Sequence, residues 1–294
     1  MGKNIKRVLI LGLDALEYEL VEKWDLKNLK QEEYGKTILP LSKEDGYFYP
    51  GPATVIIWPC FITGMPPKKI GIQTVKIYPL NFLYKFYLRY IYPKGESEKR
   101  RDIRDKSTYR KMMDKISNVI SSLHLSREPT RRDIKVPTMF EAIPNSIHRH
   151  IPVYDNDAFS NKGMIVQAIE NDIYKPIFEA GAMREFNERS NEVMKYIEKN
   201  DWTLFMEYFF VLDGIQHVFY NNPRKIAKFY VLFDEFVGKV RQKIDDDTLL
   251  LIVSDHGQKR GLHTNYGFYS VNKPLGLKNP RLIDFRWLIE DLIG

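Results

Sequence analysis

The sequence predicts an α/β protein with a mostly parallel central sheet and helices on both faces. Three observations point to this class: apolar runs flanked by charged residues, helical periodicity between those runs, and polar side chains directly after several of them. The 294 residues allow one large domain, or one domain with an insert. A content of 44% hydrophobic and 28% charged residues is typical of a globular protein with a sizeable core.

Four segments carry the strand prediction. Arg7–Leu13 is a nearly continuous apolar run, the pattern of a strand that is buried on both faces. Similar runs are Thr248–Val253 and Trp202–Tyr208, and a weaker one is His150–Tyr154. We expect these segments to form the centre of the sheet.

Two helices are predicted between and after these runs. Apolar residues recur at helical spacing over Met183–Lys199 and again over Pro223–Ile244. Strands that alternate with helices form parallel sheets covered on both faces. In such sheets ligands bind outside the carboxyl ends of the strands, so the residues at those ends are the first candidates for a site.

Residues 78–137 differ from the rest and are predicted to form a basic helical cap or insert on a core made of residues 1–77 and 138–294. The segment begins with an aromatic-rich stretch, Asn81–Tyr92, and becomes highly charged. Between Lys94 and Lys135 there are 13 Lys and Arg against 7 Asp and Glu, which accounts for most of the formal net charge of +7.

The insert admits several interpretations. Its basic cluster is more often a solvated face than a nucleic-acid site, and if the insert covers the site it would steer anionic substrates. The aromatic run Phe82–Tyr90 is more often packed in a core or cap than laid on a membrane surface. We therefore expect a small anionic partner rather than nucleic acid.

A few features of the sequence indicate the cellular compartment and whether the chain can form a disulfide. Cys60 is the single cysteine, which excludes an internal disulfide. The first apolar run stops at Asp14, too soon for a signal-peptide core, and no later run reaches the roughly 18 apolar residues of a transmembrane helix. We expect a cytoplasmic protein without a transmembrane segment, and its oligomeric state does not follow from the sequence.

Polar side chains follow three of the predicted strands at the point where each strand ends. Because the carboxyl ends of parallel strands meet at one edge of a sheet, we expect these side chains to converge. Asp213 and His217 are four residues apart, so on a helical turn they share one face and can bind the same ion. The full candidate set is Asp14, Asp213, His217, Asp255, His256 and His263.

This set points to bound divalent cations. Three carboxylates crowded together repel one another, and each tends to take up a proton unless a cation is present. Mixed aspartate and histidine ligands suit zinc, with manganese or iron as alternatives. Some members also have an ordinary structural explanation: Asp14 can cap a helix, and Asp213 with His217 can form a surface pair, whereas Asp255-His256 after a buried strand needs partners. The combination at three strand ends is more specific than any single member.

Thr54 is the candidate nucleophile. It opens an apolar stretch that is predicted to be helical, and it could simply be the N-cap of that helix. Backbone N–H groups at a helix start also favour an anion such as phosphate, and a metal bound to the hydroxyl would lower its pKa. Were Thr54 the N-cap, Pro59 would lie beyond the helix positions that tolerate proline, so the helix should begin later or bend.

Taken together, these motifs resemble the alkaline phosphatase superfamily, most closely its type I phosphodiesterase/nucleotide pyrophosphatase branch. The resemblance extends from Val8 to about Gly267 and is poor over residues 78–137. Its motifs are Leu11-Gly12-Leu13-Asp14, then Thr54 with Thr63-Gly64, Pro67 and Gly71-Ile72, then Asp213-Gly214-Ile215-Gln216-His217, and finally Ser254-Asp255-His256-Gly257 with His263.

The resemblance implies an alkaline-phosphatase-like fold and a hydrolase with two divalent metal ions. One ion would be held by Asp213, His217 and His263. The other would be held by Asp14, Asp255, His256 and the oxygen of Thr54. The mechanism it implies is an in-line displacement in which Thr54 attacks phosphorus and water then cleaves the threonine-linked intermediate.

Two positions depart from the pattern on which the resemblance rests. Ile57 stands three residues after Thr54, where nucleotide pyrophosphatases usually have an asparagine that contacts a phosphoryl oxygen, and Ile70 stands where a histidine is common. Phosphodiesterase or pyrophosphatase activity is the expected function. A phosphomonoesterase, a phosphosugar mutase of the same superfamily, and a relative that binds metal and phosphate without cleaving remain as alternatives.

Overall fold

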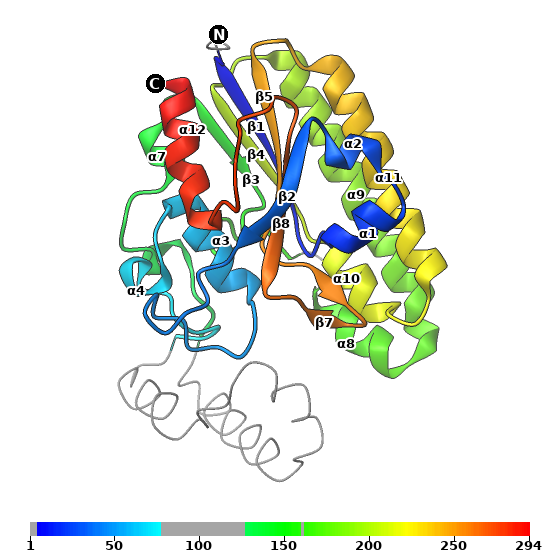
Figure 1. Ribbon diagram of the computed structural model, residues 1–294. Helices are drawn as coiled ribbons and strands as arrows, with labels where there is room; N and C mark the ends of the chain where they lie inside the picture. Colours follow the sequence, from blue (N-terminus) through cyan, green and yellow to red (C-terminus); the bar gives the residue numbers. More distant parts are fainter. Residues whose placement is uncertain (1–4, 78–126, 160–161) are drawn as a thin grey trace.

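A six-stranded sheet forms the centre of the molecule (Figure 1). The computed structural model describes residues 5–77, 127–159 and 162–294. The strand order is β2-β8-β5-β1-β4-β3; β1, β3, β4 and β5 are parallel, and β8 runs antiparallel to its neighbours β5 and β2. The strands are β1 (Arg7–Leu13), β2 (Glu33–Ile38), β3 (Ser146–Arg149), β4 (Leu204–Phe209), β5 (Thr248–Ser254) and β8 (Tyr266–Val271).

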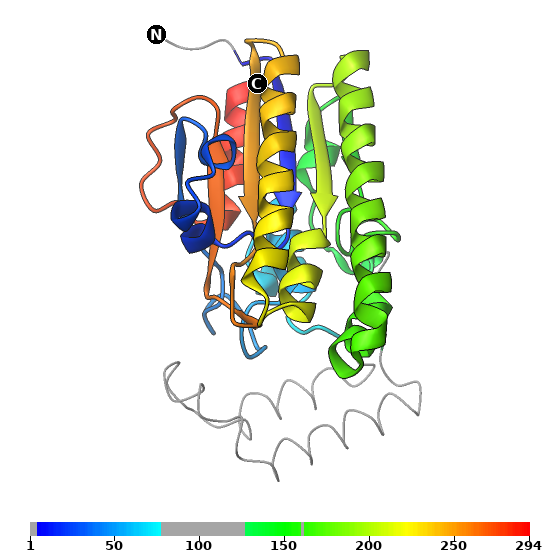
Figure 2. The same cartoon turned by 90° about the vertical axis from the view of Figure 1, so that its right-hand side faces the viewer.

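Helices cover both faces of this sheet. One face packs against α3 (Thr54–Thr63), α7 (Met139–Ala142) and α12 (Phe285–Ile293). The other face packs against α1 (Tyr18–Lys23), α2 (Lys27–Lys30), α9 (Lys175–Lys199), α10 (Val211–Val218) and α11 (Pro223–Lys243). Figure 1 shows α3 and α12 on one side of the sheet and α9 and α11 on the other, and Figure 2 looks onto the side that carries α9 and α11. The expected α/β class with a mostly parallel sheet is therefore confirmed.

Short elements complete the described chain. A two-stranded ribbon of β6 (Gln258–Lys259) and β7 (Leu262–His263) follows β5. The remaining helices are α4 (Pro67–Ile70), α8 (Lys162–Glu170) and the 3-10 turns η2 (Arg131–Asp133), η3 (Asp172–Tyr174) and η4 (Leu282–Asp284).

The middle strand β1 shows why the apolar runs were informative. It lies between β4 and β5, and successive side chains point to opposite faces of the sheet. Val8 and Ile10 enter the core beside α3, whereas Leu9 and Leu11 enter the core beside α9 and α11. A strand with helices on both faces needs apolar residues at every position, which produces a run without alternation.

One predicted strand was wrong. His150–Tyr154 is not a strand: β3 ends at Arg149, and the chain then turns. His150 and Val153 both have left-handed backbone angles, with φ of 59° and 71°. The Asp155 carboxylate accepts the Ile151 backbone N–H at 2.9 Å, which fixes the turn in place of a sheet partner.

The predicted helices lie where expected, with one boundary difference. Pro223–Lys243 agrees with the predicted range, but the helix predicted from Met183 begins at Lys175, two turns earlier. The early turns carry an exposed Ile177, which weakens the apolar periodicity there. None of the helices in the described ranges combines the length and apolar character needed to cross a bilayer.

Most of the expected insert, residues 78–137, lies outside the described part of the chain. This holds for the aromatic run Phe82–Tyr90 and for the basic residues up to position 126. Ile77 and Arg127, which flank residues 78–126, exchange two backbone hydrogen bonds of 2.8 and 3.0 Å and therefore lie side by side. Ile134 and Val136 pack against the core beside α3.

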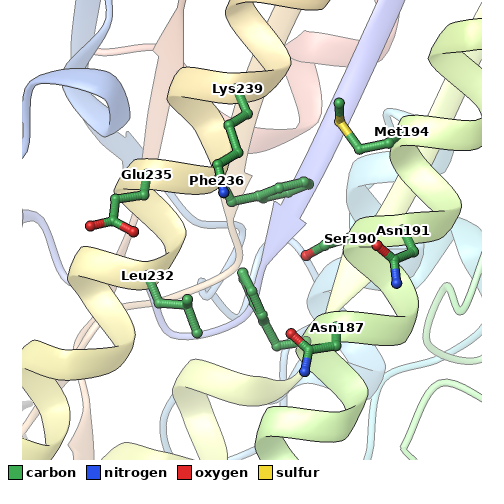
Figure 3. A pocket seen from close by; sticks show the side chains of 9 residues that line it. Asn187, Ser190, Asn191, Met194, Leu232, Glu235, Phe236 and Lys239 are labelled. Carbon is green, nitrogen blue, oxygen red and sulfur yellow. The ribbon is translucent and has the colours of Figure 1, made fainter.

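A pocket of about 180 Å³ lies between α9 and α11. Figure 3 shows side chains from both helices around it, with the hydroxyl of Ser190 directed inward. The pocket belongs to the helical layer and contains none of the polar residues that follow the strands. The candidate site lies elsewhere, at the strand ends.

Candidate metal centre

Topology brings the predicted polar residues together. Strand β1 pairs with β4 on one side and with β5 on the other, although these strands lie about 200 residues or more away in the chain. Asp14 follows β1 and Asp255 follows β5, while Asp213 lies in α10 just after β4. All three carboxylates are buried beyond the carboxyl ends of adjacent parallel strands, as expected for a ligand site in such a sheet.

Asp213, His217 and His263 form the first group. Oδ1 of Asp213 lies 3.3 Å from Nε2 of His217 and 3.3 Å from Nε2 of His263. The two Nε2 atoms are 3.0 Å apart. Three ligand atoms thus face a single point, which suits one divalent ion.

Asp14, Asp255 and His256 form the second group, with Asp213 beside them. Nε2 of His256 lies 3.4 Å from Oδ1 of Asp14 and 3.4 Å from Oδ2 of Asp255. Asp14, Asp213 and His256 also satisfy the spacing for a common ion. Asp213 therefore takes part in both groups, whereas the resemblance assigned it to one ion only.

Thr54 lies at the edge of the second group. It is the first residue of α3, after the extended residue Ala53, and its Oγ1 is 3.5 Å from Nε2 of His256. Thr54 is not the N-cap, which is Ala53, and of the two expected alternatives, a later start or a bend at Pro59, the later start was wrong: α3 begins at Thr54 and includes Pro59. The ten-residue helix directs its first N–H groups toward the space next to the Thr54 hydroxyl, an arrangement that favours an anion.

A layer of further residues orients the candidate ligands, and sequence reasoning missed it. The Tyr208 hydroxyl donates to Oδ2 of Asp14. The Pro52 carbonyl lies 3.1 Å from Nδ1 of His263, and accepting the proton there leaves Nε2 free for a metal. Nε2 of Gln258, an amide donor, lies 2.9 Å from Nδ1 of His217 and holds that ring in place, but unlike the Pro52 carbonyl it cannot accept a proton from it. These contacts depend on three-dimensional proximity and leave no motif in the sequence.

Electrostatics at the site favour a bound cation. Burial, and then the charge of Asp213, raises the pKa of Asp255 to about 7. Burial and the charges of Asp255 and Asp213 also raise the pKa of Asp14. Burial lowers the pKa of His256 to about 4, so this imidazole is neutral and available as a ligand. Carboxylates that resist ionisation without a counter-charge are stabilised by dications.

Buried carboxylate oxygens without hydrogen-bond partners also favour a bound cation. Among the described residues, Oδ1 of Asp14, Oδ1 of Asp213 and both carboxylate oxygens of Asp255 are buried without a hydrogen-bond partner. Buried polar atoms are almost always paired, so a cluster of exceptions calls for a ligand. The donor set of carboxylates and imidazoles fits divalent transition metals.

The match to known sequences agrees with the geometry. A family model for type I phosphodiesterase/nucleotide pyrophosphatase matches residues 8–279. The chain belongs to this family. Through it the chain belongs to the alkaline phosphatase superfamily, as the resemblance implied. No curated protein sequence matches the chain.

Several solved structures match this member of the family at low sequence identity. Murine ectonucleotide pyrophosphatase/phosphodiesterase 5 matches with 12% identity and a TM-score of 0.43, over 86% of this chain and 57% of that one. Phosphonoacetate hydrolase from Sinorhizobium meliloti 1021 matches with 13% identity and a TM-score of 0.46, over 87% and 57%. A protein from Pyrococcus horikoshii matches with 12% identity and a TM-score of 0.45, over 98% and 97%. The chain thus spans 57% of the length of the first two proteins.

The two departures from the family's pattern both lie in the core. Ile57 in α3 and Ile70 in α4 are fully buried and pack in the cluster beside α3. Neither side chain is exposed toward the strand-end residues. In this member of the type I phosphodiesterase/nucleotide pyrophosphatase family, the polar groups of the candidate site come from the strand ends, α10, β7 and the start of α3.

Proposed function

We propose that this chain hydrolyses phosphate esters with two divalent metal ions and with Thr54 as the nucleophile. The observation that carries the proposal is the convergence of six metal-ligand side chains next to the hydroxyl at the start of α3. The residues offered as ligands are Asp14, Asp213, His217, Asp255, His256 and His263, with the Thr54 oxygen. Membership of a family of phosphate-ester hydrolases supports the reaction type.

Thr54, the start of α3 and the six ligands have different roles in the proposed reaction. The oxygen of Thr54 forms a bond to phosphorus while the bond from phosphorus to the leaving oxygen breaks, which leaves the phosphoryl group esterified to Thr54. Water then breaks the Thr54–phosphorus bond and restores the hydroxyl. The first N–H groups of α3 orient the non-bridging oxygens during both steps. Divalent ions held by the six ligands would lower the pKa of the Thr54 hydroxyl and offset charge on the phosphoryl group.

The finer assignments follow from chemistry and from the family. Mixed aspartate and histidine ligands favour zinc, with manganese or iron as alternatives. We propose a small anionic diester or pyrophosphate as substrate, because a threonine nucleophile is typical of that branch of the superfamily. We also propose that residues 78–137 form a cap that contributes to the leaving-group side, a proposal that rests on their composition and position in the sequence.

The test is hydrolysis of bis-p-nitrophenyl phosphate by protein that has been stripped with a chelator and reloaded with zinc or manganese. Thr54→Ala should lower kcat by at least about 10³-fold, because the nucleophile acts as a unit with its surroundings. Thr54→Ser should keep measurable turnover. Thr203→Ala is the matched control, since Thr203 lies directly before the amino end of β4, at the end of the sheet opposite the strand-end residues.

The outcomes separate the alternatives. Equal rates for wild type and Thr54→Ala would refute the nucleophile assignment. Faster turnover of p-nitrophenyl phosphate than of the diester would indicate a phosphomonoesterase. Bound metal with no turnover of either ester would favour the non-catalytic relative.

A further inference from the structure

A second group of titratable side chains lies at the β3 edge of the sheet. Glu207 is in the middle of β4, where its neighbours Phe205 and Phe209 face the core beside α9. His150 directly follows β3, and Glu192 lies on α9. Tyr208, the next residue in β4, donates to Asp14 from the opposite face of the strand. The edge group is therefore separated from the strand-end residues by β4 itself.

Glu207 is the centre of this group. Its side chain is completely buried, and Oε1 lies 2.6 Å from Nδ1 of His150. Oε2 is buried and has no hydrogen-bond partner among the described residues. Burial raises the pKa of Glu207 to about 7. A buried carboxylate with one oxygen unpaired requires either a proton or a positive charge beside it.

His150 is held in an unusual backbone conformation that directs its ring toward Glu207. Its φ of 59° lies in the left-handed region, which is uncommon for residues other than glycine. The ring has carboxylates at both ends: Nδ1 faces Glu207, and Nε2 lies 3.5 Å from Oδ2 of Asp157. A histidine that binds a metal through one nitrogen commonly donates its other N–H to a carboxylate.

Glu192 completes a set of three donors. One ligand atom from each of His150, Glu192 and Glu207 lies within 4.8 Å of the other two. Ligand atoms on one tetrahedral zinc ion lie about 3.4 Å apart, given bond lengths near 2.1 Å. A shift of about an ångström is available to Glu192, whose side chain is 30% exposed at the surface of α9.

The charges around the group leave room for a dication. Four carboxylates lie at or beside it, and two guanidinium groups oppose them. Arg149 pairs with Glu192 at 2.8 Å, and Arg189 pairs with Glu185 at 3.3 Å while donating to the Tyr208 carbonyl. With one proton shared between His150 and Glu207, the acids exceed the positive charges by one, and by two once a metal displaces that proton. The other two acids are Asp157 and Glu207.

We propose that His150, Glu192 and Glu207 bind one divalent transition-metal ion of the zinc class, distinct from the ions of the strand-end cluster. The ion would link the end of β3 to β4 and to α9, at the edge of the sheet where β3 has only one strand partner. Its role is to stabilise the fold, because no residue of the group contacts Thr54 or the strand-end ligands.

The experiment measures zinc stoichiometry and thermal stability in chain stripped with a chelator. The background, called the strand-end double variant below, combines Asp213→Asn with Asp255→Asn, so that each strand-end group loses a carboxylate while the edge group is untouched. In this background one zinc ion should remain per chain by elemental analysis. Adding His150→Asn, which tolerates a left-handed backbone, or Glu207→Gln should remove it and lower zinc affinity by at least about 100-fold.

His148→Asn is the matched control. His148 is a neighbouring histidine that pairs with Asp155 at 2.9 Å and lies outside the three-donor set. Zinc should raise the Tm of the strand-end double variant with or without His148→Asn, and the increase should disappear when His150→Asn is added. Glu192→Gln, on the surface of α9, provides a variant that weakens binding without disturbing the buried pair.

Equal zinc stoichiometry and an equal Tm shift with and without His150→Asn would overturn the proposal. So would the absence of any bound zinc in the strand-end double variant. Because hydrolytic activity is not a readout here, failure of this proposal and failure of the proposed function give different results.

Discussion

The strand-end cluster and the β3-edge group both contain buried carboxylates and histidine, but they balance charge differently. In the edge group, two arginines offset part of the negative charge. In the strand-end cluster, none of the ion pairs among the described residues joins a lysine or arginine to Asp14, Asp213 or Asp255. If both proposals hold, the chain itself supplies part of the positive charge where an ion would stabilise the fold. It would leave that charge to the ions where they are needed for the reaction.

This difference has an energetic consequence. A buried carboxylate without a cation is costly, so the strand-end cluster should be the least stable part of the metal-free protein. The edge group can instead share a proton between His150 and Glu207 when no metal is bound. Four changes test this contrast, and they are given from the largest expected effect to the smallest.

Asp213→Asn should have the largest effect because Asp213 belongs to both strand-end groups. We expect the ion bound with His217 and His263 to be lost, the ion among Asp14, Asp255 and His256 to bind more weakly, and diester hydrolysis to fall at least about 10³-fold. Elemental analysis and kcat for bis-p-nitrophenyl phosphate check this. Asp247→Asn is the matched control, because Asp247 lies just before the amino end of β5 and pairs with Lys6. Full metal content in Asp213→Asn would contradict the arrangement.

Metal removal should make stability depend on pH through Asp255. Its pKa is about 7 in the folded chain against an ordinary value of 3.8, so the folded state binds the proton more tightly. The contribution of Asp255 to stability is present below about pH 4 and is lost as pH rises through about 7, on the order of a few kcal/mol. Urea unfolding in EDTA from pH 4 to 8 measures it.

The same titration with Asp255→Asn isolates this group, since the amide has no proton to lose. Its curve should be flatter over that range than the wild-type curve. Identical slopes for the two metal-free proteins would show that Asp255 ionises normally in the folded state. Saturating zinc should reverse the trend, because metal binding requires deprotonated ligands.

The packing of β1 against α3, beneath the strand-end cluster, should be sensitive to an added methyl group. A Cβ added at Gly12 in β1 would lie 2.8 Å from the Trp58 ring of α3, the helix that carries Thr54. We expect Gly12→Ala to destabilise the fold by about 1–3 kcal/mol through overpacking. Gly163→Ala in α8 has open space around it and serves as control. Equal unfolding midpoints in urea for both variants would show that Trp58 moves aside freely.

Arg149→Gln should have the smallest effect and bears on the edge group. Its guanidinium pairs with Glu192 and is 41% exposed, so its loss should cost less than about 1 kcal/mol. Removing a competing positive charge should raise zinc affinity at the edge group by a few-fold. Urea unfolding measures the change in stability, and isothermal titration in the strand-end double variant measures the change in zinc affinity. Weaker zinc binding would argue against competition between Arg149 and the ion.

The sequence predicted the centre of the fold better than its edges. Strands β1, β4 and β5 are buried on both faces, so burial alone produces their apolar runs. The edge strand β2 was not predicted because half of its surface meets solvent and it includes Gly35 and Lys36. The strand predicted after β3 failed because left-handed turns at His150 and Val153 do not follow from hydrophobicity.

Most of the candidate ligands were found because they directly follow an apolar run or repeat at helical spacing, whereas His263 was found by its place after Asp255 and by the family resemblance. Tyr208 and Gln258 were missed because their roles arise from strand pairing and from the fold of the β6–β7 ribbon. Glu207 did carry a signal, since it is a charged residue inside a buried run. That signal gives no partner, and only the structure places His150 and Glu192 beside it.

The most direct test of the central claim is an anomalous-scattering measurement on crystals grown with zinc or manganese. The account predicts two peaks at the strand ends, one among Asp213, His217 and His263 and one among Asp14, Asp255 and His256 near the Thr54 hydroxyl. Crystals with saturating metal and no peak at the strand ends would contradict it.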